Sequence, residues 1–448
     1  MSFPRYPKYK DSGVEWLGEV PAHWAVFSLK RDLDFLTSGS RGWAENYSDE
    51  GELFIRIANL TRNSIALDLS DIQRVAVTDG AEGSRTKVQT GDVLFSVTAY
   101  LGSVAVVPDA LETAYVSQHV ALARLRQLWL LPRWVGYVAL SFVGQTWFET
   151  QSYGGTKIQL SLDDVRNLPV TVPPISEQQN IAAFLDRETA KIDGLVGEQR
   201  RLMDLLKEKR QAVISHAVTQ GLNPHASMKP SGIEWLGDVP EHWSVSPVAY
   251  RYSVQLGKML DSTKITGEHL RPYLRVFDVQ WGDVNTDDLP QMDFDEDARS
   301  KFRLVFGDLL VNEGGSYPGR SAIWLGTIDE CYYQKALHRL RPNCTEKDTT
   351  RFMYYLMSWA ANEGVFVAGG NETTIEHLPA EKLRRYRFAF PPITEQMEIA
   401  SFLDSELAKF DSLTAEAQRA IDLLQERRTT LISAAVTGQI DVREAMSA

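Results

Sequence analysis

Ser12-Gly-Val-Glu-Trp-Leu-Gly-Glu-Val-Pro-Ala-His-Trp24 returns 219 residues later as Ser231-Gly-Ile-Glu-Trp-Leu-Gly-Asp-Val-Pro-Glu-His-Trp243. A second block, Pro173-Pro-Ile-Ser-Glu-Gln-Gln-Asn-Ile-Ala-Ala-Phe-Leu-Asp186, returns 218 residues later as Pro391-Pro-Ile-Thr-Glu-Gln-Met-Glu-Ile-Ala-Ser-Phe-Leu-Asp404. Two nearly equal offsets at distant points predict two units of equal length and similar fold. The residues between the repeated blocks differ, so the sequence predicts one shared scaffold that carries two different surfaces.

The composition is that of an ordinary globular protein. The 448 residues are 44% hydrophobic and 24% charged, and this length predicts two to four domains. Its two cysteines, Cys331 and Cys344, exclude a disulfide framework and a cysteine-rich zinc site. No apolar run is long enough for a membrane span, and the first residues lack a signal peptide, so we expect a cytoplasmic protein. The net charge of −12 argues against a simple nucleic-acid binder, although binding depends on local charge.

Each unit is predicted to contain a tryptophan-rich element (residues 12–24 and 231–243), a mixed segment and a long helix. Alternating apolar residues broken by Gly, Asp and Asn predict strands in the mixed segments. The clearest elements are predicted strands at 92–97 and 308–312 and predicted helices at 133–140 and 351–358. The predicted division of the chain is mixed domains at 1–172 and 223–390, and helical segments at 173–222 and 391–448.

The second repeated block predicts the start of each long helix, over 175–221 and 393–439. A Pro-Pro pair ends the preceding strand, and Ser176 and Thr394 stand where we expect helix N-caps. Ser176 and Gln179 fit a capping box, and the glutamate after each cap suits the positive end of the helix dipole.

The two helical segments carry apolar residues at the alternating spacing of a coiled-coil seam. The seam residues are Ile181, Leu185, Ile192, Leu195, Leu202, Leu206 and Val213, and then Ile399, Leu403, Phe410, Leu413, Leu424 and Leu431. We expect the two helices to pair with each other in antiparallel orientation, because an unpaired apolar seam promotes aggregation. The alternative is that each seam binds another protein. Gly194 and Gly197 predict a bend or break in the first helix.

Sequence motifs of catalysis are absent. The chain has no phosphate-binding Gly-x-x-x-x-Gly-Lys-Ser/Thr loop, no Gly-x-Gly-x-x-Gly, and no Asn/Asp-Pro-Pro-Tyr/Phe motif of amino-methyltransferases. The repeated histidines His23 and His242 are interpreted as structural. His119 and His338 do not stand at matching positions, which argues against a shared catalytic role. The acidic run at 293–297 is interpreted as a solvated loop rather than a metal site.

Three pairs of loops at equivalent positions suit a polymeric ligand. Glycines let a backbone approach a duplex, Arg and Lys recognise guanine, and Asn and Gln recognise adenine. An ordinary turn is the alternative for any one loop, but three varied pairs favour recognition. The candidate contacts are Ser38, Arg41, Tyr100, Thr156, Lys157 and Gln159 in the first unit, and Lys258, Lys264, Asn312, Tyr317, Arg320, Asn371 and Thr374 in the second.

With these motifs the chain resembles the specificity subunits of type I restriction-modification systems. The resemblance rests on both repeated blocks, in this order, and on the Gly-Asp-Val/Leu-Leu strand, and it covers nearly the whole chain. It implies an α+β fold with two target-recognition domains separated by two long helices in an antiparallel coiled coil. Each domain is expected to read one half of a bipartite DNA site, and the helices are expected to set the spacing.

The resemblance also implies a subunit without catalytic activity. Two modification subunits would bind the helices, hold S-adenosylmethionine and methylate adenine in double-stranded DNA. Restriction subunits would add ATP- and Mg²⁺-dependent translocation and cleavage, and this chain would bind no cofactor itself. Two other classes stay open on the residues alone: an enzyme with an unrecognised site, and a coiled-coil scaffold that makes no base contacts.

Overall fold

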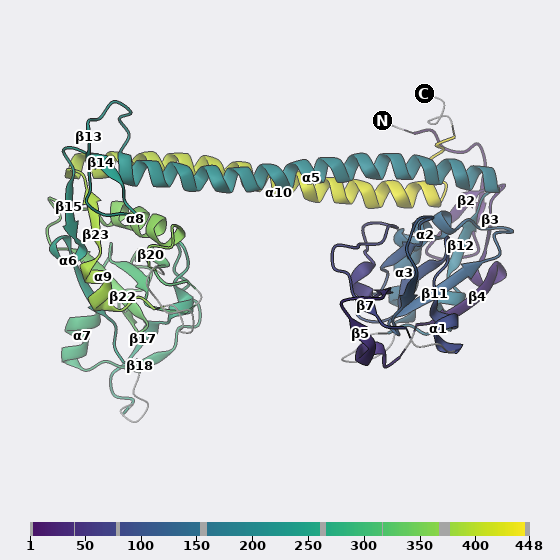
Figure 1. The fold of residues 1–448 in the computed structure, drawn as a ribbon, viewed down its shortest axis with the longest axis horizontal. Helices are drawn as coiled ribbons and strands as arrows, with labels where there is room; N and C mark the ends of the chain where they lie inside the picture. The colour runs from purple at the N-terminus through teal and green to yellow at the C-terminus, as the bar shows by residue number, and fades with distance from the viewer. Residues whose placement is uncertain are drawn as a thin grey trace. The chain divides into compact units, whose positions relative to one another are not determined.

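The computed structural model describes residues 3–39, 41–77, 81–152, 159–259, 266–315, 317–366 and 377–443. Its contacts divide the chain into two compact units (Figure 1). Unit 1 comprises Met1–Arg200 and Gln418–Ala448, and unit 2 comprises Arg201–Ala417. Each unit therefore contains one mixed domain together with part of each long helix. Within the described ranges, no helix is both long and apolar enough to cross a membrane.

The two predicted long helices are confirmed as α5 (Ile175–Gln220) and α10 (Ile393–Val436). Helix α5 is continuous, so the break predicted at Gly194 and Gly197 is wrong. Both glycines have open space around the position of a Cβ atom, so neither one marks a close contact. Backbone hydrogen bonds on both sides keep single glycines helical at a modest cost in stability.

Unit 1 is built around an antiparallel sheet in the order β4–β11–β8–β9. Its strands are β4 (Leu33–Ser38), β11 (Val120–Leu125), β8 (Val93–Ser96) and β9 (Val104–Val106). Helix α2 (Pro132–Leu140) packs on β8 and β9, and α3 (Phe142–Gln151) packs on α2. The strand predicted at 92–97 and the helix predicted at 133–140 are therefore confirmed.

A second sheet of unit 1 has the order β10–β6–β7–β5, with β10 and β6 parallel. Two strand pairs, β1–β2 and β3–β12, complete the strands. Their bounds are β1 (Tyr9–Asp11), β2 (Glu19–Pro21), β3 (Ala25–Ser28), β5 (Tyr47–Ser48), β6 (Glu52–Ile55), β7 (Arg74–Val75), β10 (Ala114–Val116) and β12 (Pro169–Val172). The short helices are η1 (Leu29–Arg31), η2 (Trp43–Asn46), η3 (Ile57–Asn59), α1 (Ala81–Thr86) and α4 (Leu162–Arg166).

Unit 2 repeats this plan, so the predicted internal repeat is confirmed. Its main sheet has the order β16–β22–β19–β20, and a smaller sheet has the order β18–β17–β21. The strands are β13 (Met228–Pro230), β14 (Asp238–Pro240), β15 (Ser244–Pro247), β16 (Tyr252–Leu256), β17 (Leu270–Leu274), β18 (Gln291–Asp293), β19 (Leu309–Asn312), β20 (Ser321–Ile323), β21 (Tyr332–Tyr333), β22 (Leu337–Pro342) and β23 (Arg387–Phe390). The helices are α6 (Val248–Arg251), η5 (Val276–Asp278), α7 (Glu296–Phe302), α8 (Thr350–Asn362) and α9 (Ala380–Arg385).

The last tryptophan of each tryptophan-rich element belongs to the core. Trp24 is fully buried and meets Trp134 of α2 edge to face, with ring centroids 5.7 Å apart. In unit 2, Trp243 meets Phe352 of α8 in the same way at 6.3 Å. Large buried aromatic rings dominate core energetics, so this repeated residue anchors the element to its domain.

In each unit, α5 and α10 pack side by side and run in opposite directions (Figure 1). Ion pairs join them, from Arg428 to Asp193 in unit 1 and from Arg210 to Asp411 in unit 2, each at 2.5 Å. The buried seam of unit 1 comprises Ile181, Leu185, Ile192, Val196, Ile421 and Ile432. The buried seam of unit 2 comprises Leu206, Ile214, Ile399, Leu403, Leu407, Phe410 and Ala417.

The predicted seam is wrong at three leucines. Leu195 and Leu413 are 46% exposed and Leu202 is 42% exposed, whereas Val196 is buried; Leu424 is partly buried. A straight helix turns every 3.6 residues, so a strict seven-residue pattern drifts off the buried face. In the buried seam of α5, Ile192 is therefore followed by Val196 instead of Leu195.

Two neighbouring leucines of α5 test this seam directly. Leu206 is 8% exposed and Leu205 is 52% exposed. We expect Leu206→Ala to reduce the free energy of unfolding of unit 2 by about 2–4 kcal/mol, because it leaves a cavity in the seam. Leu205→Ala should change it by less than about 0.5 kcal/mol. Urea unfolding followed by circular dichroism measures both, and equal effects would contradict the observed register.

Candidate nucleic-acid interface

Two predicted loops of unit 1, and the described residues that follow the third, meet at one end of its main sheet. The loop after β4 bonds to β11 through Gly39 N and Val120 O at 3.0 Å, and the loop after β8 bonds to β11 through Val97 N and His119 O at 3.0 Å. The third loop joins them, because Leu160 N donates to Val97 O at 2.9 Å. This end of the sheet is called the loop edge below.

Unit 2 forms an equivalent loop edge with the same hydrogen bonds. Gly257 N donates to Leu337 O at 3.0 Å, and Glu313 N donates to Ala336 O at 3.0 Å. Leu378 N donates to Glu313 O at 2.6 Å. Loops that are 60 to 120 residues apart in each unit therefore form one surface, at matching places in the two copies.

A glycine is required at the first loop of each edge because two backbones approach closely there. A Cβ atom on Gly39 would lie 2.1 Å from the carbonyl oxygen of Ser117. On Gly257 it would lie 2.2 Å from the carbonyl oxygen of Gln334. The glycines thus keep the first loop against the end of the sheet.

An exposed tyrosine occupies the same place on the second loop of each edge. Ser103 N donates to Tyr100 O, and Arg320 N donates to Tyr317 O, both at 3.2 Å. Tyr100 is 64% exposed and Tyr317 is 57% exposed. In unit 2 the guanidinium of Arg320 lies 4.2 Å from the centre of the Tyr317 ring and donates to Gln280 Oε1 at 2.7 Å. Exposed aromatic rings of this kind can stack on a base.

Other predicted contact residues have more varied surroundings. Arg41 is exposed, Ser38 is partly buried with its carbonyl oxygen bonded to Arg85, and Gln159 pairs with Thr98 in an isolated bridge. Predictions for Thr156, Lys157, Lys264, Asn371 and Thr374 lie outside the described residues.

Two predicted contacts are engaged inside unit 2. Asn312 is 4% exposed and its Nδ2 donates to Val276 O at 3.1 Å, so its side chain is engaged inside the unit and its contact with DNA stays a prediction. The ammonium group of Lys258 contacts the carbonyl oxygen of Asp293 and lies 4.8 Å from the centre of the Phe294 ring. Lys258 therefore already has intramolecular partners for its charge.

A repeated Arg-x-x-Asn/Asp pattern was missed in the sequence although it was visible there. Arg56 N donates to Asn59 Oδ1 at 2.9 Å, and Arg275 N donates to Asp278 Oδ2 at 2.7 Å. Each pair caps a short helix, η3 or η5, which follows a strand of the smaller sheet. In unit 2 this brings Phe277, 59% exposed, beneath the Arg275 guanidinium at 4.1 Å.

The sheet beneath the loop edge differs between the units. Position 338 of β22 is a histidine where β11 has Ala121, and position 313 is a glutamate where unit 1 has Val97. Burial lowers the pKa of His338 to about 4, so the ring is neutral, and its Nε2 donates to Leu378 O at 2.7 Å. Burial also raises the pKa of Glu313, whose Oε1 lies 3.4 Å from His377 Nε2. Among the residues described, no cluster of His, Cys, Asp and Glu could hold a metal ion.

The first turn of each long helix fixes the tryptophan-rich element. Glu177 accepts hydrogen bonds from Tyr6 Oη at 2.6 Å and from Trp24 Nε1 at 3.2 Å, and its other oxygen lies 2.9 Å from His23 Nε2. Glu395 contacts Trp243 Nε1 and His242 Nε2 at 3.1 and 2.7 Å. The structural interpretation of the two repeated histidines is therefore confirmed.

The predicted N-caps are wrong. Helix α5 begins at Ile175, and the carbonyl oxygen of Pro174 accepts from Glu177 N and Gln178 N at 2.9 and 3.0 Å. Ser176 and Thr394 consequently lie inside the first turn, and the capping box of Ser176 does not form. Pro174 therefore stands at the N-cap position of α5, where its carbonyl accepts the first intrahelical bonds and its side chain offers no acceptor.

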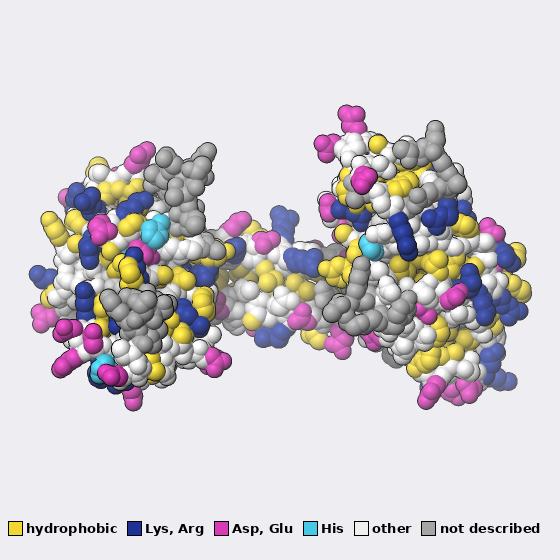
Figure 2. All heavy atoms as spheres, turned by 90° about the horizontal axis from the view of Figure 1, so that it is seen from below, with side chains coloured by type: hydrophobic (Ala, Val, Ile, Leu, Met, Phe, Trp, Pro, Cys, Tyr) yellow, Lys and Arg dark blue, Asp and Glu magenta, His cyan; other side chains and the backbone are white. Residues whose placement is uncertain are grey.

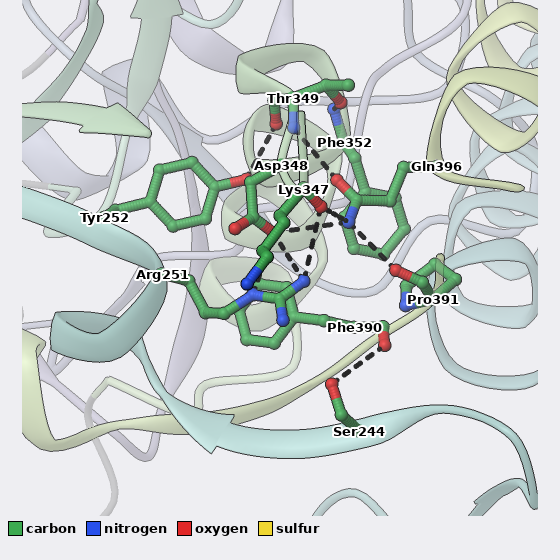
Figure 3. Close-up of polar contacts among 10 residues, drawn as sticks. All are labelled: Ser244, Arg251, Tyr252, Lys347, Asp348, Thr349, Phe352, Phe390, Pro391 and Gln396. Carbon is green, nitrogen blue, oxygen red and sulfur yellow. Dashed lines mark hydrogen bonds and ion pairs between the residues drawn. The ribbon is translucent and has the colours of Figure 1, made fainter. Parts of the chain in front are cut away.

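The glutamine after each of these glutamates joins the helix to its domain, and Figure 3 shows the contacts of Gln396 in unit 2. Gln396 is fully buried, accepts from Thr349 N at 3.0 Å, and donates to Lys347 O and Pro391 O, both at 3.0 Å. Beside it, Arg251 pairs with the buried Asp348 at 2.7 Å.

Gln178 forms the same contacts in unit 1. It accepts from Leu131 N at 2.9 Å and donates to Trp129 O and Pro173 O at 2.7 and 2.9 Å.

Residues 26–199 and 299–422, more than half of the chain, match the family described as the type I restriction modification DNA specificity domain. The chain belongs to this family. It is 22% identical over 283 residues to the EcoKI specificity subunit of Escherichia coli strain K12, covering 62% of this chain and 58% of that protein. The EcoBI subunit of E. coli is 24% identical over 298 residues, with 63% and 60% covered. The chain thus spans about three fifths of the length of these two relatives.

A third relative and two solved structures align over most of the chain. The StySPI specificity subunit of Salmonella potsdam is 22% identical over 455 residues, covering 94% of this chain and 90% of that protein. A chain from a study of type I R-M complex assembly and conformational transition has a TM-score of 0.71 at 16% identity, with 94% of this chain and 99% of that chain covered. The HsdS subunit of Thermoanaerobacter tengcongensis has a TM-score of 0.54 at 15% identity, with 94% and 98% covered. These likenesses show the same fold.

The glutamine contact predicts a large local effect on stability. We expect Gln396→Ala to lower the free energy of unfolding of unit 2 by about 2–4 kcal/mol, because it leaves a buried amide and two buried carbonyls without partners. Glu398→Ala, at an exposed site one half-turn further along the same helix, is the control and should have little effect. Chemical denaturation gives both values, and equal stability of the two variants would disprove the role of Gln396.

Proposed function

We propose that the chain is the non-catalytic DNA-specificity subunit of a type I restriction-modification complex. Each unit would read one half of a bipartite site in double-stranded DNA through its loop edge. The observation that carries this proposal is the duplicated loop edge: its backbone hydrogen bonds are the same in both units, whereas its side chains differ. Family membership and the likeness to HsdS structures support the same function.

The chemistry of the loop edges suits a duplex. Exposed aromatic and cationic groups can contact bases and sugars, while loop amides and hydroxyls can fix the register on phosphates. Tyr317 and Arg320 form such a pair in unit 2, and Tyr100 stands at the equivalent place in unit 1. Different polar groups on one scaffold would let the two units select different sequences.

Charge favours shared binding of DNA. The net charge is −12, and Figure 2 shows Lys and Arg side chains interspersed with Asp and Glu on the drawn face of both units. A duplex-binding surface gains most of its affinity by neutralising phosphates. The modification subunits would therefore supply much of the electrostatic attraction, and the isolated chain would bind DNA weakly.

Two copies of one partner require two equivalent surfaces, and exposed leucines on the helices fit this requirement. Leu195 of α5 and Leu413 of α10 are equivalent in the repeat and are both 46% exposed. Leu205 and Leu423 form a second equivalent pair, 52% and 65% exposed. Two modification subunits would dock there and hold S-adenosylmethionine, while restriction subunits would hold ATP and Mg²⁺.

Substitution of the loop-edge tyrosines tests base reading. In the complex with modification subunits, Tyr317→Ala should reduce methylation at least tenfold and relax one half-site only, and Tyr100→Ala should do so at the other. Tyr250→Ala is the control, since Tyr250 is 77% exposed beside the opposite end of β16. Mapping of methylated adenines across a genome provides the readout. Unchanged recognition in both loop variants would favour a coiled-coil scaffold that makes no base contacts.

Charged substitution of the leucines tests the partner surface. Leu195→Lys together with Leu413→Lys should weaken assembly with the modification subunit at least tenfold, because an ammonium group would replace an apolar contact. Leu128→Lys, at a 65% exposed position on the loop before α2, is the control. Size-exclusion chromatography with light scattering gives the assembly state. Normal assembly of the double variant would exclude this face as the docking site.

A further inference from the structure

A second repeated contact joins each domain to its long helix, about two turns beyond the glutamine. In unit 1, Tyr137 of α2 donates to Asp186 Oδ1 of α5 at 2.5 Å, and Arg133 Nε donates to Asp186 Oδ2 at 3.1 Å. In unit 2, Tyr355 of α8 donates to Asp404 of α10, and Arg351 pairs with the same carboxylate. Each set of Arg, Tyr and Asp is called a joint triad below.

The tyrosine of each joint triad is held rigidly by its domain. Tyr137 is 3% exposed and Tyr355 is 5% exposed, so their rings lie in the domain cores. Desolvation by burial raises the pKa of Tyr355 to about 12, so its hydroxyl stays protonated and donates at neutral pH. Because the ring is rigid and its hydrogen bond is directional, this contact restrains the orientation of the domain relative to the helix.

A groove lies on one side of each joint, next to the apolar contacts between the domain and its long helix. In unit 1 a groove of about 790 Å³ is lined by Arg133, Tyr137 and Asp186 together with residues of the 64–69 loop. In unit 2 a groove of about 700 Å³ is lined by residues of α5 and by Trp281 and Tyr355. Apolar packing supports each tyrosine from the domain side, and at the groove the polar contacts of the triad add resistance to tilting.

A small tilt at the joint would move the loop edge by the height of one base pair. The domain is anchored next to the end of β11, whereas the loop edge lies at the start of β11. A six-residue strand is roughly 20 Å long, so a tilt of about 10° displaces its far end by roughly 3.5 Å. The rise per base pair of DNA is about 3.4 Å.

We propose that the joint triads, Arg133–Tyr137–Asp186 and Arg351–Tyr355–Asp404, are positioning residues that fix the number of base pairs accepted between the two half-sites. This inference rests on the proposed function. The long helices would give the coarse separation, and the triads would exclude sites that are one base pair longer or shorter. The triads would not influence which bases are read, because the loop edges lie at the far end of each domain.

The test uses the complex of the full chain with its modification subunits. A library of duplexes carries both half-sites separated by spacers of different lengths, and sequencing reports which duplexes are methylated. We expect the native complex to select one length. The double variant Tyr137→Phe, Tyr355→Phe should raise methylation at the two adjacent lengths at least fivefold, relative to the preferred length, with both half-site sequences unchanged. Asp404→Asn, which removes the ion pair but keeps an acceptor oxygen, should give a smaller change in the same direction.

Glu406→Gln is the matched control, because it breaks an ion pair with Lys409 along α10 that involves no residue of the joint. It should leave the spacer distribution as sharp as in the native complex. A sharp distribution in the tyrosine and Asp404 variants, even with lowered thermal stability, would overturn the inference and leave the triads a purely stabilising role. Absence of any bipartite methylation by the native complex would instead overturn the proposed function, and this inference with it.

Discussion

Two adjacent side chains in the first turn of each long helix hold the rest of the structure in place. Glu177 and Glu395 face the tryptophan-rich elements, while Gln178 and Gln396 face the mixed domains. Buried carboxylates and amides are costly unless each polar atom has a partner, so these contacts are specific as well as stabilising. One helical turn thereby fixes the place of three elements that are remote in sequence. This explains why Glu-Gln stands in both repeated blocks.

The end of one long helix also packs beside the tryptophan-rich element in each unit. In unit 2, Gly221 at the end of α5 lies against Trp243 and Glu395, and the chain continues directly into the tryptophan-rich element. In unit 1 the equivalent Gly438, at the end of α10, packs on Trp24, and Asp441 N donates to Pro4 O at 2.8 Å. In unit 1 the segment after α10 therefore contacts the segment before the tryptophan-rich element through space. In unit 2 the chain itself connects the end of α5 to the tryptophan-rich element. Each unit obtains equivalent contacts although the covalent connection differs.

The sequence predicted what depends on periodicity and missed what depends on tertiary contacts. Both long helices and the central strands were predicted because apolar spacing reports local structure. The predicted seam was wrong at Leu195 and Leu202. Whether Leu195 or Val196 is buried depends on packing against the other helix, which the spacing of apolar residues does not show. The N-cap at Ser176 was wrong because α5 begins at Ile175, directly after Pro174, and residue type does not fix a helix end to a single residue.

At the candidate site, too, local sequence predicted the loops, whereas contacts between distant residues were not predicted. The glycine predicted in the first loop of unit 1 is required there, because its backbone approaches that of Ser117 closely at Gly39. The sequence did not reveal that Asn312 is buried, because its hydrogen bond is to Val276, 36 residues earlier in the chain. Differences between the units also extend beneath the loops, where His338 and Glu313 stand in place of Ala121 and Val97. Because neutral His338 bonds to the carbonyl of Leu378 and so supports the third loop from below, the surface of unit 2 depends on its own sheet. Specificity should therefore move between proteins with a whole domain rather than with exposed loop residues alone.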